Sequence, residues 1–202
     1  MNWAEPNWPV PGGLILARGA ITLGMTTGQD APGLHDALDH DEVWRHVRGR
    51  PASVEDVRVM IERAQTQGRW MWTVRSAGAV VGTTSYLDVS LIDARLEIGF
   101  TAYAPRCWGT AVNPTCKFLL MSWAFEEAGF TRVQLKTDIR NLRSQAAIER
   151  LGAHREGVLR CYQRRQDGTL RDTVMYSVLL EEWPRVKLRL QDRLTSSSVE
   201  PK

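Results

Sequence analysis

The chain has 202 residues, of which 43% are hydrophobic and 24% charged, and these are ordinary values for a single globular domain. No apolar run approaches the ~20 residues of a membrane span, and residues 1–11 lack the basic and apolar regions of a secretory signal. The 26 basic and 23 acidic residues are interspersed, which disfavours nucleic acid as a partner. The composition predicts a cytoplasmic protein that makes no membrane contact.

The first half of the chain predicts an antiparallel meander preceded by helices. The expected elements are a strand at 14–25, short helices at 32–38 and 42–47, a longer helix at 54–67, and strands at 70–75, 80–89 and 95–101. Ser53 is the expected N-cap of the longer helix and Gly68 its end. In the last strand Leu96, Ile98 and Phe100 alternate, which predicts one shared face for them and the opposite face for Glu97.

The second half alternates helix and strand. The expected elements are a helix at 113–128, a strand at 132–137, a helix at 141–151, hairpin strands at 154–166 and 169–180, and a helix at 183–194. Asn113 before Pro114 indicates the start of the first of these helices, and Asn141 and Gly152 the ends of the second. Because a strand-helix-strand unit implies a parallel pair, we expect an α/β fold with a mixed sheet of seven strands. It forms one domain over 14–194, after a lead-in at 1–13 and before a disordered tail at 195–202.

The turn between the strand at 95–101 and the next helix has the properties of an anion site. Gly109 and Ala111 remove side-chain bulk where backbone N–H groups emerge, and a helix start adds unsatisfied donors and a positive dipole end. No Gly-Lys-Ser/Thr follows, and the three spaced glycines of a dinucleotide site are absent. The turn therefore predicts a phosphate site of another kind.

The pattern Arg106-x-x-Gly109-x-Ala111 resembles the pyrophosphate-binding signature of the GNAT superfamily of acyl-CoA-dependent N-acyltransferases. Downstream, Asn-Leu-Arg-Ser at 141–144, Glu-Arg-Leu-Gly at 149–152 and Glu-Gly at 156–157 resemble the RimJ/RimL-like branch, whose members acetylate protein N-termini and other amines. The resemblance implies a GNAT fold with helices on both faces and splayed fourth and fifth strands that admit a pantetheine arm. It implies acetyl-CoA as co-substrate, held by Arg106, Trp108, Gly109, Thr110, Ala111, Val112, Asn113, Asn141 and Ser144.

Acyl transfer to an amine needs a base for the amine and an acid for the departing thiolate. Glu97 is the candidate base, acting through water, although a structural ion pair would explain it equally well. Ser144 is the candidate acid, although Asn141 and Ser144 also suit helix capping. Tyr162 and Tyr176 are weaker candidate acids.

The three cysteines are widely spaced and odd in number, which favours reduced thiols over disulfides or a zinc site. A nucleophilic role of Cys107 or Cys116 is disfavoured, because no histidine lies near either in sequence. The four histidines lack metal-ligand spacing, so we expect no bound metal. Trp44 and Trp108 are expected near the substrate cleft.

The free-energy cost of deprotonating the amine indicates which class of acceptor the enzyme uses. At pH 7 a lysine amine of pKa ~10.4 loses its proton at a cost of about 4.6 kcal/mol, whereas an α-amine near ~7.8 costs about 1.1 kcal/mol. This favours a protein or peptide N-terminus as the amine. Succinyl-CoA as donor, a polyamine or aminoglycoside as acceptor, and a homodimer remain open alternatives. Glu97 and Ser144 argue against the alternative of a non-catalytic acyl-CoA sensor, and the dispersed charge argues against an arginine-rich RNA-associated module.

Overall fold

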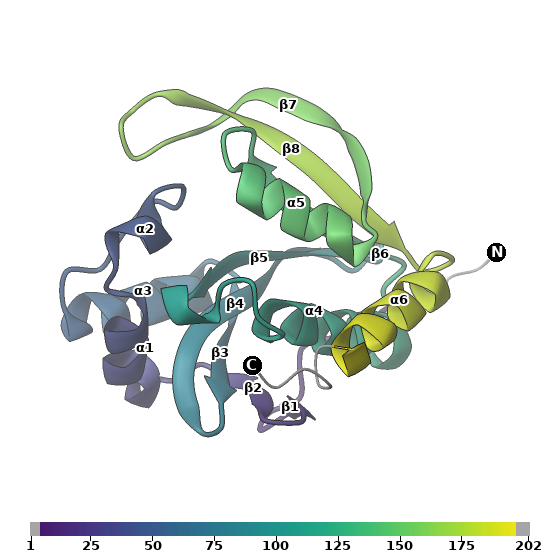
Figure 1. Cartoon of the computed structure of the whole chain (residues 1–202), viewed down its shortest axis with the longest axis horizontal. Helices are drawn as coiled ribbons and strands as arrows, with labels where there is room; N and C mark the ends of the chain where they lie inside the picture. Colours follow the sequence, from purple (N-terminus) through teal and green to yellow (C-terminus); the bar gives the residue numbers. More distant parts are fainter. Residues whose placement is uncertain (1–4, 197–202) are drawn as a thin grey trace.

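The computed structural model describes residues 5–196, and its strands form one sheet in the order β1-β2-β3-β4-β5-β6-β8-β7 (Figure 1). The sheet has eight strands in this part of the chain, so the expected number of seven is wrong. The expected strand at 14–25 is two antiparallel strands, β1 (Ile15–Arg18) and β2 (Ile21–Met25). Gly19 reverses the chain between them at a φ of +57°, a conformation that glycine adopts without strain.

The meander is confirmed by β3 (Trp70–Ser76), β4 (Ala79–Ser90) and β5 (Arg95–Tyr103), which pair antiparallel in this order. Ala77 and Gly78 connect β3 to β4 with φ values of +48° and +83°. Positive φ at two successive positions gives the tight turn whose twist matches that of the flanking strands.

Phe100 departs from the expected alternation in β5. Leu96 and Ile98 lie in the core, but Phe100 is 52% exposed and has a φ of +46°. The register between β4 and β5 shifts at this point, which is the mark of a β-bulge. The bulge turns the ring away from the core and under the guanidinium of Arg69, which lies 4.3 Å from the ring centroid. The expectation that Phe100 shares the core face was therefore wrong.

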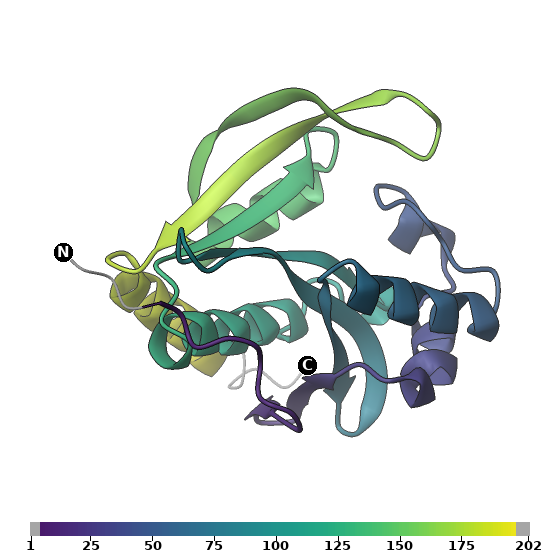
Figure 2. The same ribbon diagram turned by 180° about the vertical axis from the view of Figure 1, so that it is seen from behind.

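Helices cover both faces of the sheet (Figures 1 and 2). They are α1 (Ala31–Leu38), α2 (Asp41–Trp44), α3 (Val54–Thr66), α4 (Val112–Ser122), α5 (Leu142–Leu151) and α6 (Trp183–Ser196). Asp30, directly before α1, forms an ion pair with Arg75 of β3. Trp72 is three positions from Arg75 and therefore lies on the opposite face. There its ring packs on Tyr86, 5.9 Å between centroids, whose hydroxyl donates to the carbonyl of Leu120 in α4 at 2.6 Å.

The aromatic cluster on the α4 face includes a residue of the N-terminal segment. Trp8 packs against Trp70, Tyr86, Trp123 and Phe130, with centroid distances of 5.0–6.1 Å. Aromatic pairs at such distances contribute beyond the area they bury. The cluster attaches the segment before β1 to the core.

The separation between β5 and β6 (Arg132–Asp138) is the feature that positions the site. These strands are parallel but pair over three positions, from Arg95 opposite Arg132 to Glu97 opposite Gln134. Beyond these pairs the described strands continue without pairing with each other. The predicted splay is confirmed, and the additional strand at the N-terminal edge makes it fall between the fifth and sixth strands.

The C-terminal part follows the expected order of elements. Asn141 caps α5 by accepting from the amide of Ser144 at 3.1 Å, and Gly152 ends the helix with a φ of +95°. The hairpin is formed by β7 (His154–Arg164) and β8 (Leu170–Leu179). α6 extends to Ser196, whereas residues 197–202 of the predicted tail lie outside the described residues. In the described part no helix is both long and apolar enough to cross a bilayer.

The N-cap of α3 gives a stability prediction. The Ser53 hydroxyl accepts from the amide of Asp56 at 3.1 Å, as the sequence predicts. Ser53→Ala leaves this amide without its partner and should lower the free energy of unfolding by about 1 kcal/mol. Urea denaturation measures the loss. Ser53→Thr keeps the hydroxyl and is the matched control, so equal losses in both variants would contradict the capping role.

Candidate functional site

The turn after β5 is built by a short helical turn at Pro105–Cys107 and by Gly109, whose φ is +77°. α4 begins at Val112, so the expected start at Asn113 was wrong. Its N-cap residue is Ala111, whose side chain cannot accept a hydrogen bond. The Thr110 hydroxyl accounts for the difference, because it accepts from the Val112 amide at 3.3 Å and donates to the carbonyl of Cys107 at 2.8 Å. The helix therefore begins earlier, and Asn113 lies in its first turn.

Three amides of this turn have no partner within residues 5–196. They are those of Gly109, Ala111 and Asn113. The amide of Trp108 is bonded inward, to the carbonyl of Pro105 at 3.0 Å. A Cβ built on Gly109 meets nothing within 4 Å, so the space beside this residue is open. Unpaired amides at a helix start in open space are the chemical requirements of an anion site.

A basic pocket of about 280 Å³ adjoins the turn. It is lined by Glu42, Arg45, His46, Trp108, Arg140, Asn141, Leu142 and Arg143. In the described chain, no carboxylate lies within ion-pair distance of the arginines at 45, 140 and 143. Burial, together with the charge of Arg45, lowers the pKa of Arg143. The pocket thus holds positive charge that the described part of the protein does not neutralise.

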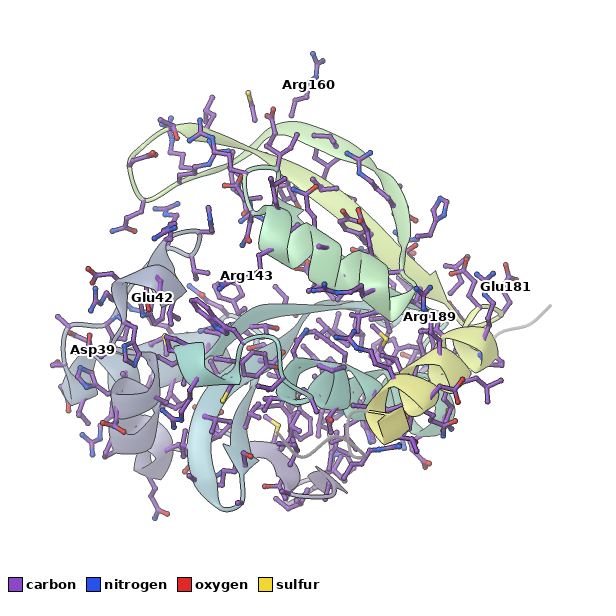
Figure 3. The ribbon with its side chains drawn as sticks, viewed as in Figure 1. Asp39, Glu42, Arg143, Arg160, Glu181 and Arg189 are labelled. Carbon is purple, nitrogen blue, oxygen red and sulfur yellow. The ribbon has the colours of Figure 1, made fainter. Side chains whose placement is uncertain are left out.

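Trp108 and Arg143 connect the turn to α5. The Arg143 guanidinium lies 3.5 Å from the Trp108 ring centroid, and the indole N–H donates to the carbonyl of Tyr103 at 3.0 Å. Figure 3 shows Arg143 on α5 and Glu42 on α2, the two elements that face each other across the pocket. Trp108 lines the pocket, whereas Trp44 donates to the carbonyl of Leu38 at 2.7 Å and does not line it. Arg106 is exposed in the turn.

Glu97 lies at the point where β5 and β6 separate. It is 6% exposed, and its Oε2 is 2.6 Å from the Nζ of Lys136. Lys136 also donates to Asp88 at 2.7 Å. Burial raises the pKa of Glu97, and the Lys136 ammonium opposes this increase. The carboxylate is buried and paired with one cation.

A second cavity, of about 490 Å³, borders Lys136. It is lined by Asp88, Val89, Arg95, Gln134, Lys136, Tyr162 and Met175. The ring of Tyr162 is 5.5 Å from the Nζ of Lys136. Tyr176, in contrast, is buried and donates to Glu149 of α5 at 3.0 Å. Of these two tyrosines, the structure brings Tyr162 to the cavity that Lys136 lines.

The two candidate catalytic residues lie on opposite faces of the sheet. Tyr176, which contacts α5, shares a face with Leu96 through the registers of β8, β6 and β5. Glu97 follows Leu96 and therefore points to the other face. Ser144 is in the first turn of α5, and its half-buried hydroxyl has no hydrogen bond to a described residue. Asn141 is the cap, as the alternative interpretation predicts. Glu97 and the helix that carries Ser144 therefore lie on opposite faces of the sheet.

Two lysines were missed in the sequence. Lys136 alternates with Val133, Leu135 and Thr137 as a solvent-facing residue would, so its pairing with Glu97 gave no local signal. Lys117 is 4% exposed in α4. Its signal was available, because it interrupts the apolar run Cys116–Met121 that packs against the sheet.

The cysteines are all free. Cys116 has no exposed surface, and burial raises the pKa of its thiol to about 11, which makes it a poor nucleophile at neutral pH. Within residues 5–196 no three His, Cys, Asp or Glu side chains are grouped so that they could hold a metal ion.

Comparison with known proteins matches residues 21–154 to the acetyltransferase (GNAT) domain. The uncharacterized N-acetyltransferase YoaA of Bacillus subtilis (strain 168) is 27% identical over 172 residues, 82% of this chain and 96% of YoaA. A solved structure from T. thermophilus, assigned as an acetyltransferase, is 38% identical, covers 93% of this chain and 100% of its own, and superposes with a TM-score of 0.85. Mycobacterium smegmatis RimJ, solved with CoA-disulfide, shares the fold at 20% identity and a TM-score of 0.77, with 94% and 97% of the chains covered. The chain belongs to the GNAT family of N-acetyltransferases.

Proposed function

We propose that this N-acetyltransferase binds acetyl-CoA with its pyrophosphate on the free amides of Gly109, Ala111 and Asn113 and transfers the acetyl group directly to an α-amine. The observation that carries the proposal is the set of unpaired amides at the open end of the gap between β5 and β6. The complex of RimJ with CoA-disulfide supports a CoA group as the ligand of this fold.

The surroundings of the turn suit a donor with several phosphates. Arginine binds phosphate through two parallel hydrogen bonds, and Arg45, Arg140 and Arg143 supply the positive charge beside the turn. Arg106 is exposed and can reach a phosphate from the turn itself. Trp108 and Asn141 both line the pocket beside the turn. The hydrogen bond from the Val112 amide to the Thr110 hydroxyl holds the turn in its conformation.

The reaction uses both faces of the sheet. The acceptor nitrogen attacks the thioester carbon, its proton passes through water to Glu97, and the C–S bond breaks. Lys136 favours the ionised form of Glu97, which a base requires. The Ser144 hydroxyl, on the other face, donates a hydrogen bond to the departing sulfur. The low cost of deprotonating an α-amine at pH 7, about 1.1 kcal/mol, matches a single base acting through water.

The burial of the cysteines is consistent with direct transfer of the acetyl group. A covalent acetyl-enzyme would need a thiolate, and both Cys107 and Cys116 are buried. Burial holds the pKa of Cys116 at about 11, so its thiol is protonated at neutral pH. The amine and the thioester therefore have to be bound together, and we expect the reaction to occur in the cytoplasm, where the chain is expected to reside.

Thiol release across a panel of amines tests the function. We expect release of CoA from acetyl-CoA with a peptide that has a free α-amine. We expect little release with the same peptide acetylated at its N-terminus, with spermidine or with an aminoglycoside. Succinyl-CoA is the matched donor control. Binding of acetyl-CoA without thiol release on any amine would contradict the proposal and indicate an acyl-CoA sensor.

A further inference from the structure

Lys117 is a buried cation that has no acidic partner among the described residues. It is 4% exposed, and its Nζ donates to the Thr101 hydroxyl at 2.9 Å. The Thr101 hydroxyl lies 2.8 Å from that of Thr84. Within residues 5–196 no carboxylate lies at ion-pair distance from Lys117. Lysine is almost never fully buried unless it is paired, so this position has a cost in stability that the surrounding packing does not explain.

The location of Lys117 connects it to the candidate site. Thr101 belongs to the part of β5 that lies beyond the last pair with β6, so it borders the gap. Lys117 follows Val112, the first residue of α4, by five positions, which is about 7.5 Å along the helix axis. The negative charge of Glu97 acts on Lys117 from the point of separation. The ammonium therefore contacts the part of β5 that borders the gap.

The proposed reaction lacks a source for one proton. The departing thiolate has to be protonated, and a serine hydroxyl can donate a hydrogen bond but gives up its own proton only if another group replaces it. Burial lowers the pKa of Lys117 to about 8. A thiol has a reference pKa of ~8.5, so a proton moves from this lysine to a thiolate with little change in free energy.

We propose that Lys117 is the acid that protonates the sulfur of CoA as the thioester breaks. As the acceptor nitrogen bonds to the carbonyl carbon, the electrons of the C–S bond go to sulfur, which takes a proton from Nζ of Lys117. The proton of the acceptor passes through water to Glu97. Transfer of one proton from Glu97 through solvent back to Lys117 then restores both groups. The net reaction converts the amine and the thioester into an amide and a free thiol. This inference rests on the proposed function.

Two substitutions separate the acid from a structural cation. Lys117→Met removes an unpaired buried charge, so we expect an unchanged or higher melting temperature. We expect kcat to fall about 10²-fold or more and the Kd of acetyl-CoA to stay nearly unchanged. Lys117→Arg keeps the charge but does not release its proton near neutral pH, so kcat should fall here too. The control is Lys187→Met, on α6 at an ion pair with Glu126, for which we expect the rate of the unmodified enzyme.

A binding measurement tests Lys117 without turnover. Ultraviolet absorbance of the thiolate gives the apparent pKa of the thiol in bound CoA. An adjacent ammonium stabilises the thiolate, so this pKa should be lower on the unmodified enzyme and on Lys117→Arg than on Lys117→Met. With acetyl-CoA and an α-amine, kcat of the unmodified enzyme should decline above about pH 8, as Lys117 loses its proton, and this decline should be absent in Lys117→Met.

The outcomes separate the two proposals. Full kcat in Lys117→Met, or equal thiol pKa values on all three proteins, would overturn the role of Lys117 and leave the function intact. Rescue of kcat by Lys117→Arg would also overturn it, because a fixed charge would then suffice. Absence of thiol release by the unmodified enzyme, despite CoA binding, would refute the function and with it the catalytic role of Lys117.

Discussion

Glu97→Gln is expected to lower kcat by about 10²–10⁴-fold while the Kd of acetyl-CoA stays nearly unchanged. The amide fits the same buried space but cannot take the proton of the amine. In the proposed mode the donor is held by the turn at 109–113, which follows the end of β5 and includes the start of α4, away from Glu97. The rate of thiol release gives kcat, and calorimetric titration with acetyl-CoA gives its Kd. A fully active variant would remove Glu97 from the mechanism.

The pH dependence of kcat is a second test of Glu97 as the base. Burial raises the pKa of Glu97, and a base has to be ionised, so kcat should fall as pH falls through this raised pKa. The acidic decline should disappear in Glu97→Gln, whatever rate remains. Asp88→Asn is the matched control, because Asp88 contacts Lys136 at 2.7 Å but its own side chain is half exposed. It should keep the acidic decline and most of the rate.

Ala111→Glu is expected to weaken acetyl-CoA binding by about 10²-fold, which corresponds to about 2.7 kcal/mol. The new carboxylate would stand beside the amides proposed to hold the pyrophosphate, and like charges repel there. The same carboxylate at the start of α4 interacts favourably with the helix dipole, typically by about 0.3–1 kcal/mol, so the melting temperature should stay the same or rise. Binding and stability are thus expected to change in opposite directions.

Ala111→Gln is the control for the size of the side chain at this exposed position. It should weaken binding much less than Ala111→Glu, because it carries no charge. Calorimetry and thermal unfolding measure both variants. If the two variants bind acetyl-CoA equally well, the phosphate site does not lie at this turn.

Local signals in the sequence predicted most of the elements. Ser53, Asn141 and Gly152 act where their residue types predict, because capping depends on a few neighbouring backbone groups. The splay between β5 and β6 was predicted from the family resemblance, whereas the turn at 109–111 was predicted from Gly109, Ala111 and the helix that follows them. These features depend on short segments or on a motif that the family shares.

The remaining features depend on contacts between distant segments. The bulge at Phe100 follows from the register with β4, which the alternation of β5 alone does not contain. Lys136 reaches Glu97 because β6 lies beside β5, and the two residues are 39 positions apart. The contact of Lys117 with Thr101 exists only because α4 packs on β5 in the folded protein. Phe100 and Lys136 have an ordinary sequence context, whereas Lys117 interrupts an apolar run; the contacts of all three follow from the tertiary fold.

Three residue pairs join two half-sheets, β1–β5 and β6–β8–β7, and beyond them each half ends in an unpaired strand edge inside the protein. Such an edge is a template for a foreign strand, so the ligand-free enzyme carries an internal aggregation hazard. A ligand that fills the gap at 100 times its Kd would add about 2.7 kcal/mol to the folded state. The cell's supply of that ligand would then set the lifetime of the enzyme as well as its rate.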